Sequence, residues 1–207
     1  MFRIETRLTF VLLASTALTQ FATAAELPKA PTVLHGSVGV ATPSPSAMTI
    51  QQSSRSAIVN WQGFSIGEGG RVDIRQPNAS SALLNRVTGA TPSTIAGQLN
   101  ANGQVYLVNP NGIAITRSGV VRAGGFVAST LGMSDDDFKN DRRHFRGGGQ
   151  SAAVVNHGAI EIGHGGYAAL TGGSVENSGT ISVPMGRVGL GAGEAATLDL
   201  SATASCR

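Results

Sequence analysis

The sequence is poor in cysteine, in charged residues and in aromatic residues. Its single cysteine, Cys206, excludes an intramolecular disulfide, and no histidine or acidic residue stands beside it to make it a catalytic thiol. Charged residues make up only 13% of the 207 residues, which argues against long charged helices. The formal net charge is +3 and the arginines are scattered, so we expect no nucleic-acid partner.

The sequence also lacks an apolar run long enough to span a membrane as a helix. The run LTFVLLASTAL, Leu8–Leu18, follows Arg3 and Arg7 and precedes the small residues Ala22–Ala24. This order is typical of a secretory signal peptide. Residues 1–25 are therefore predicted to be a signal peptide, cleaved after Ala24 or Ala25, with the Sec translocon and signal peptidase as partners. An N-terminal anchor is the alternative.

Glycine, in contrast, is abundant, with 28 copies. From Ser56 onward, apolar runs of about five residues alternate with breaks that contain Gly, Asn or Pro, which indicates short strands and turns. In AIVNWQGFSIG, residues 57–67, the side chains of Ile58, Phe64 and Ile66 share one parity of an extended chain. Residues 26–57, rich in Pro, Ser and Thr, are predicted to form a lead-in of cap and edge strands.

Internal repeats indicate how the strands are arranged. VVNHGAI, residues 154–160, resembles VENSGTI, residues 175–181, at an offset of 21. GYAALTGG, residues 166–173, resembles GRVGLGAG, residues 186–193, at an offset of 20. GGFVAST, residues 124–130, resembles GGYAALT, residues 165–171, at an offset of 41, which we interpret as two periods.

A unit of about 20 residues without a helix cannot form a domain alone, but it can form one coil of a parallel β-helix. A β-sandwich also has short strands, yet it needs no such self-match. Residues 58–200 are therefore predicted to form an all-β rod of roughly seven coils, about 30–35 Å long. In this rod Ile160 should stack on Ile181, and Asn156 on Asn177.

Residues 134–150 interrupt the repeat. Four acidic and four basic residues balance there to a formal charge of zero: Asp135, Asp136, Asp137, Asp141, Lys139, Arg142, Arg143 and Arg146. We predict a solvated excursion from the rod. A metal site in the aspartate run is rejected, because the EF-hand order of ligands and glycine is absent.

The sequence offers little catalytic chemistry, and no enzyme is predicted. The four histidines lack zinc-ligand spacing, and neither a nucleophile elbow nor a phosphate loop is present. Glu161, Glu176 and Glu194 fall at related coil positions and could form an outward ladder, as in carbohydrate-cleaving β-helix enzymes. Stacked like charges repel, so this signal is weak. No metal or other cofactor is expected.

Several ordered motifs resemble one known family. VNWQGFSIGEGGRVDI, LNRVTGATPSTIAGQLNANGQVYLVNPNGI, GGFVAST and VVNHGAI are similar to the two-partner secretion (TPS) domain at the N-terminus of filamentous haemagglutinin-like adhesins and contact-dependent inhibition exoproteins. The resemblance runs from about Leu34 to Leu200. It implies a right-handed parallel β-helix with an N-terminal β cap.

The resemblance also implies a role in secretion. The family's domains stay unfolded in the periplasm and engage the periplasmic (POTRA) domains of a dedicated outer-membrane β-barrel transporter. They fold outside the cell and nucleate the β-helix of the passenger behind them. The expected location is therefore secreted or cell-surface, reached through the periplasm. The alternative is a β-helix module that itself binds carbohydrate or a host or bacterial cell surface.

The family's recognition motif falls on Asn109, Pro110, Asn111 and Gly112. A second family motif, Asn-Pro-Asn-Leu, is missing, as in the adhesin-type branch. Other positions in the matching motifs carry an expected structural role: Asn60, Trp61, Phe64, Asn85, Asn156 and Asn177.

The residue types of Asn109–Gly112 can also be explained locally, as those of an ordinary turn. Pro110 presets φ for the second turn position, and Asn109 can bond to the backbone two residues on. Losing one turn hydrogen bond should cost about 0.5–1.5 kcal/mol. We therefore predict that Asn109→Ala or Asn111→Ala lowers export far more than stability. Residues 201–207 lack the coil pattern, and we expect a truncated product, a fragment or an end that is capped in another way.

Overall fold

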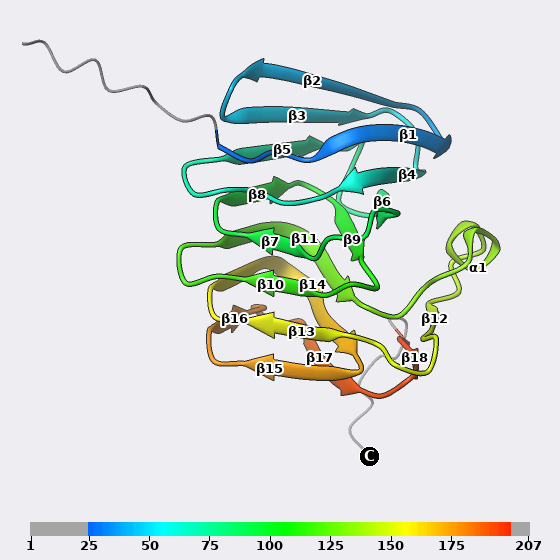
Figure 1. Cartoon of the computed structure of the whole chain (residues 1–207). Helices are drawn as coiled ribbons and strands as arrows, with labels where there is room; N and C mark the ends of the chain where they lie inside the picture. Colours follow the sequence, from blue (N-terminus) through cyan, green and yellow to red (C-terminus); the bar gives the residue numbers. More distant parts are fainter. Residues whose placement is uncertain (1–24, 200–207) are drawn as a thin grey trace, which may run out of the picture.

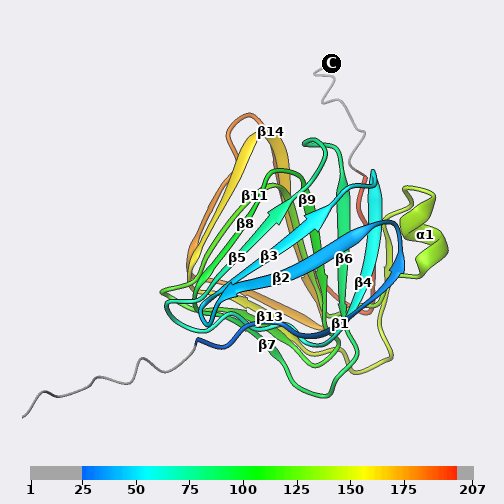
Figure 2. The same cartoon turned by 90° about the horizontal axis from the view of Figure 1, so that it is seen from above.

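The computed structural model describes residues 25–199, which form a right-handed parallel β-helix of about seven coils with one short α-helix. Residues 1–24 of the predicted signal peptide, the predicted tail 201–207 and Cys206 lie outside the described residues. Seen from above, each coil has three sides (Figure 2). We call the three stacks of strands the first, second and third faces.

Hydrogen-bonded neighbours define each face. The first face contains β3 (Ala47–Gln52), β5 (Arg71–Arg75), β8 (Gln98–Ala101), the first parts of β11 (Val120–Ser129) and β14 (Ala159–Gly172), and β16 (Thr180–Ser182). The second face contains β4 (Ser56–Gly63), β6 (Ala82–Val87), β9 (Gln104–Val108), the later parts of β11 and β14, and β17 (Arg187–Ala192). The third face contains β7 (Ser93–Ile95), β10 (Ile113–Ile115), β13 (Ala153–Asn156) and β15 (Ser174–Asn177).

Antiparallel strands close the N-terminal end of the stack (Figure 1). β1 (Lys29–His35) pairs with β4, and β2 (Val38–Ser44) pairs with β3. β3 itself already pairs in parallel with β5. An antiparallel strand blocks further parallel stacking at that edge, so these strands form the expected N-terminal cap.

Inward side chains stack in columns because equivalent residues lie one coil apart, at about 4.8 Å. Ile160 pairs with Ile181 and Asn156 with Asn177, as the offset of 21 predicts. Tyr167 pairs with Arg187, which confirms the offset of 20. The interior contains a central apolar column on the second face whose members are almost fully buried: Ala57, Leu83, Val105, Phe126 and Ala168.

The interpretation of the 41-residue offset as two periods is wrong. β11 pairs directly with β14, and Ser129 lies beside Thr171, so the two segments belong to adjacent coils. The excess length is the excursion, which leaves the stack after β11 and returns at β13. Early coils are also longer than 20 residues, since Ser56 pairs with Ala82, 26 positions later.

The outer side of the second face carries a second hydrophobic core. Five outward residues form a column that is at most 4% exposed: Ile58, Leu84, Tyr106, Val127 and Ala169. Ile58 therefore faces outward, whereas Phe64 and Ile66 face inward, because the chain leaves β4 at Gly63 before it reaches them. The expectation that these three share one side is wrong.

Two segments cover this column, and we call them together the clasp. The first is the excursion, with α1 (Asp135–Lys139) and β12 (His144–Arg146), seen at the right of Figure 1. The second is residues 193–199, whose β18 (Ala195–Thr197) pairs antiparallel with β12. Phe138 of α1 and Phe145 of β12 are each 1% exposed and pack with the outward column. The prediction of a solvated excursion is therefore wrong: most of its charges face water, but its aromatic rings and the side chain of Arg143 are buried.

Candidate functional site

The Asn-Pro-Asn-Gly motif forms the corner where the chain passes from β9 on the second face to β10 on the third face. The backbone N–H of Gly112 donates to the carbonyl of Asn109 at 3.2 Å and closes a four-residue turn. Gly112 has a φ of 120°, a left-handed value that disfavours any side chain. The turn predicted from these residue types is therefore present.

Asn109 ties this turn to the neighbouring coil. Its side chain is fully buried, and its Nδ2 donates to the carbonyl of Thr91 at 3.0 Å and to Oγ of Ser93 at 2.9 Å. Its Oδ1 accepts from the backbone N–H of Asn111 at 3.0 Å and from Nδ2 of Asn111 at 3.1 Å. The expected loss of a single hydrogen bond is wrong, because the side chain makes four.

Pro110 and Asn111 are the exposed part of the motif. Nδ2 of Asn111 also donates to the carbonyl of Gly89 at 2.8 Å, so Asn111 links the turn to the coil above from the solvent side. A protein that docks on the folded corner would meet Pro110 and Asn111, but neither the side chain of Asn109 nor the buried Gly112. A partner that reads all four residues must therefore meet them before the corner folds.

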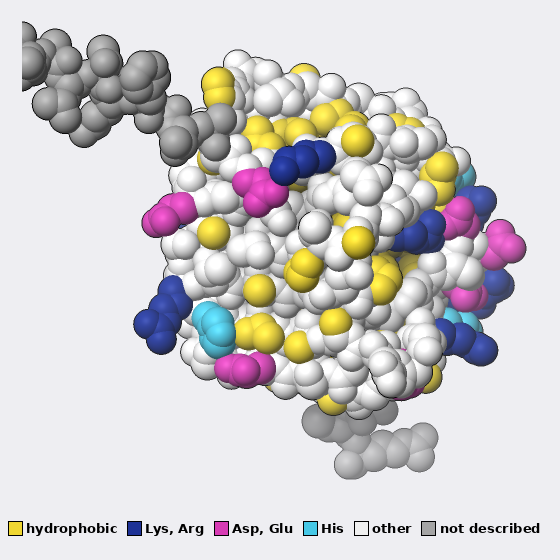
Figure 3. Space-filling model, viewed as in Figure 1, with side chains coloured by type: hydrophobic (Ala, Val, Ile, Leu, Met, Phe, Trp, Pro, Cys, Tyr) yellow, Lys and Arg dark blue, Asp and Glu magenta, His cyan; other side chains and the backbone are white. Residues whose placement is uncertain are grey.

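The third face beside this corner has few charges. Its outward column runs Thr94, Ala114, Val155 and Glu176. Figure 3 faces this side and shows most of the Lys, Arg, Asp and Glu side chains at its margins. The surface next to the motif is therefore mainly small and uncharged.

Three of the residues expected to have a structural role, Trp61, Phe64 and Asn85, form one buried cluster near the N-terminal end. The rings of Trp61 and Phe64 lie edge to face, with centroids 5.3 Å apart. Nε1 of Trp61 donates to Oδ1 of Asn85 at 3.0 Å, and Nδ2 of Asn85 donates to the carbonyl of Tyr106 at 3.4 Å. Asn60 is separate, on the outward parity of β4 beside Arg86. Packing and buried hydrogen bonds account for the three clustered residues.

Asn156 and Asn177 form a polar pair at the corner where the third face passes into the first. Nδ2 of Asn156 donates to Oδ1 of Asn177 at 2.7 Å, and Oδ1 of Asn156 accepts from the N–H of Gly158 at 3.2 Å. Asn156 is fully buried, whereas Asn177 in the last described coil is exposed. The bond between Asn156 and Asn177 joins neighbouring coils, as the bonds from Asn109 to Thr91 and Ser93 do at the other end of the third face.

Sequence reasoning missed a polar network under the clasp. Nε of Arg143 donates to the hydroxyl of Tyr106 at 2.7 Å, the hydroxyls of Tyr106 and Tyr167 lie 2.5 Å apart, and Tyr167 donates to Oε1 of Gln104 at 2.9 Å. Burial raises the pKa of both tyrosine hydroxyls, so they remain neutral donors. The available signal was Phe138 and Phe145, two aromatic residues among the charged residues of the excursion.

The glutamates do not form a ladder. Glu161 lies on the first face against Arg122, Glu176 lies on the third face, and Glu194 bonds to Ser151 in the clasp. Residues 25–199 hold no group of three or more side chains that could bind a metal ion. No helix within the same range is long and apolar enough to cross a membrane.

The described part of the chain is thus a parallel β-helix in which buried asparagine side chains at the corners bond neighbouring coils together. Residues 29–205 match the family model of the TPS secretion domain, and the chain belongs to that family. The crystal structure of the HMW1 secretion domain from Haemophilus influenzae is similar, with a TM-score of 0.78 and 38% identity, over 82% of this chain and 46% of that chain.

Two relatives are heme/hemopexin-binding proteins of Haemophilus influenzae. The one from strain Rd is 34% identical over 188 residues, which covers 87% of this chain and 21% of the relative. The other is 34% identical over 123 residues, which covers 59% of this chain and 13% of the relative. The chain therefore spans about a fifth or less of the length of these relatives.

Proposed function

We propose that this chain is the secretion-recognition module of a filamentous haemagglutinin-like exoprotein. It passes through the periplasm, engages the POTRA domains of a dedicated outer-membrane β-barrel transporter, and reaches the cell surface or the medium. The match to the TPS secretion domain over residues 29–205 supports this role. The domain is a non-enzymatic module, and no cofactor takes part in the proposed function.

The observation that carries the proposal is the burial of Asn109. All four hydrogen bonds of its side chain are made inside the folded corner, so none remains for a transporter. In the extended chain the same amide can bond to a partner. The transporter therefore recognises the motif before folding, and folding of the corner buries Asn109 and Gly112 so that they can no longer be contacted.

Once folded outside the cell, the domain then serves as a template on which the β-helix of the passenger forms. The cap prevents parallel stacking at the N-terminal end, whereas β15, β16 and β17 have no further strand stacked beyond them among the described residues. Unpaired strand edges are templates for strand addition. Growth of the β-helix from this end toward the passenger fits that asymmetry.

A reporter fused after Leu200 tests the recognition role. Its release into the medium is measured in cells with and without the cognate transporter. We expect release only with the transporter, while the amount exported to the periplasm is the same in both strains. Equal release in both strains would contradict the proposal.

A second candidate function is binding to a host or bacterial cell surface. A groove on the first face lined by Arg71, Arg75 and Arg122 favours it.

A further inference from the structure

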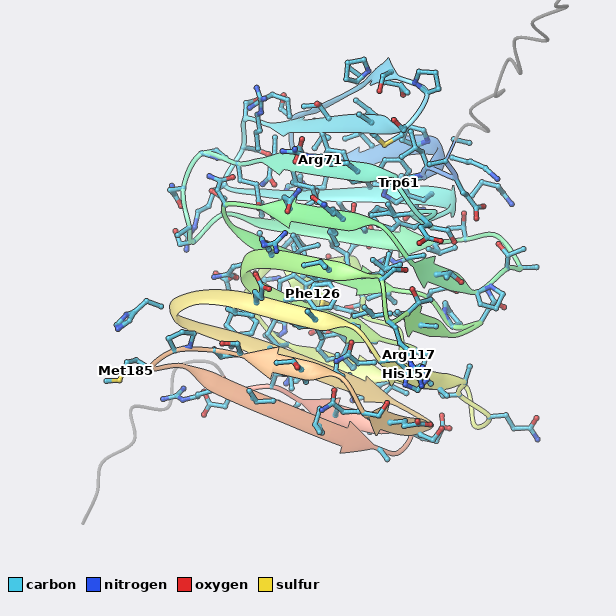
Figure 4. All side chains as sticks on the ribbon, turned by 90° about the vertical axis from the view of Figure 1, so that its left-hand side faces the viewer. Trp61, Arg71, Arg117, Phe126, His157 and Met185 are labelled. Carbon is cyan, nitrogen blue, oxygen red and sulfur yellow. The ribbon has the colours of Figure 1, made fainter. Side chains whose placement is uncertain are left out.

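The first face contains a shallow groove of about 410 Å³ near the N-terminal end. Its lining comes mainly from β5, β8 and β11, three neighbouring strands of one sheet: Arg71, Asp73, Ile74, Arg75, Asn100, Ala101, Asn102 and Arg122. Figure 4 faces this side of the molecule and labels Arg71. The three strands lie about 4.8 Å apart, so the groove runs along the β-helix axis across successive coils.

The carboxylate in this groove and the one beside it accept hydrogen bonds from arginine and asparagine side chains of the lining, and these bonds hold the donor side chains in place. Oδ1 of Asp73 accepts from Nε of Arg71 at 2.8 Å and from Nδ2 of Asn100 at 3.0 Å. Oε2 of Glu161 accepts from Nε of Arg122 at 2.8 Å. Only the Nε atom of each guanidinium group is used in these bonds, and the side chains of Arg71 and Arg122 are 57% and 47% exposed.

Arg75 completes the set. It lies on the same outward parity of β5 as Arg71 and Asp73, and its side chain makes no hydrogen bond or ion pair within residues 25–199. Three guanidinium groups thus line the groove against one carboxylate in the lining, Asp73, and one beside it, Glu161, and the guanidinium of Arg75 is bonded to neither. Guanidinium groups bind carboxylate and sulfate oxygens through paired N–H donors.

The lining also indicates what else the ligand carries. No aromatic side chain lines the groove, and its apolar members are Ile74 and Ala101, so it does not suit a stacked base or a large apolar ligand. The carbonyl oxygen of the Asn100 side chain is available to accept from a hydroxyl, since the bond to Asp73 uses only the Nδ2 donor. A ligand with several hydroxyls and a negative group fits these partners.

We propose that this groove binds an acidic oligosaccharide that lies along the β-helix axis. A carboxylate or sulfate of the saccharide meets Arg75 and the free nitrogens of Arg71 or Arg122, and its hydroxyls meet Asn100. This binding is independent of the secretion role, because the groove and the Asn-Pro-Asn-Gly corner lie on different faces.

The test is calorimetric titration of the folded full chain with a heparin-derived tetrasaccharide, with maltotetraose as the neutral probe. We expect binding of the tetrasaccharide only. Arg75→Gln should weaken that binding at least about fivefold, the effect of a lost charge-assisted contact. Arg117→Gln is the matched control, because Arg117 is exposed at the corner between the third and first faces and does not line the groove (Figure 4).

Backbone amide shifts measured by NMR during the titration locate the site, and we expect them on β5, β8 and β11. Three results would overturn the proposal. The tetrasaccharide could fail to bind at millimolar concentration, Arg75→Gln could bind it as well as Arg117→Gln does, or a DNA duplex could bind with equal affinity, which would show unspecific attraction to polyanions.

Discussion

Replacing Phe138 by alanine tests the second core most directly. The ring is 1% exposed, lies edge to face against Tyr106 with centroids 5.5 Å apart, and has the guanidinium of Arg143 at 5.3 Å. Truncating a buried phenylalanine costs about 3–5 kcal/mol. We therefore expect Phe138→Ala to lower the free energy of unfolding by about 3 kcal/mol or more, because it also removes the aromatic contact.

The assay is urea unfolding of the refolded protein, followed by circular dichroism. A shift of the midpoint at an unchanged m-value reports a loss of stability alone. Lys139→Ala, on the exposed side of the same helix, is the control and should change stability by less than about 0.5 kcal/mol. If Phe138→Ala cost no more than Lys139→Ala, the excursion would be a solvated loop and the second core would not exist in solution.

Three further predictions concern single positions. Asn109→Ala should cost about 2–4 kcal/mol in urea unfolding, because it leaves buried partners such as Ser93 unpaired; a cost below 1 kcal/mol would contradict the four-bond geometry. Met185 has a φ of 55° and is 84% exposed, so Met185→Gly should stabilise the fold by about 0.5–1 kcal/mol, and a loss of stability would refute the strain. Hydrogen bonds from Ser151 and Gly149 lower the pKa of Glu194 in the folded protein below its unfolded value of about 4.3. The difference in unfolding free energy between wild type and Glu194→Gln should therefore be constant above about pH 5 and shrink as the pH falls through the lowered pKa. A difference that does not depend on pH would contradict this.

The β-helix was predictable because, where no loop interrupts the coils, similar residues recur one coil apart along the chain. Ile160 and Ile181 are one such pair, and their register follows from the offset alone. The match between residues 124–130 and 165–171 misled because the excursion adds nearly the length of one coil between two adjacent coils. Length in sequence does not distinguish an extra coil from an inserted loop.

The candidate site was predictable as a turn but not as a buried anchor. The residue types of Asn109, Pro110 and Gly112 specify the turn locally. The burial of Asn109 depends on Thr91 and Ser93, which the β-helix brings beside it from the preceding coil. The clasp was missed for a similar reason: Phe145 is covered only when residues 195–197 return to pair with β12.

The central claim is that Asn109 is read before the chain folds, and a comparison with Asn156→Ala tests it. Both asparagines are fully buried at corners of the third face and bond to a neighbouring coil. The measurement is transporter-dependent export of the two variants, together with their unfolding free energies. Both variants should lose stability, Asn109→Ala more than Asn156→Ala, because the Asn109 side chain makes four hydrogen bonds and that of Asn156 makes two. We predict that export falls about tenfold or more for Asn109→Ala and stays within about twofold of wild type for Asn156→Ala. Losses of export in proportion to the losses of stability in both variants would contradict the claim and leave the motif as a turn only.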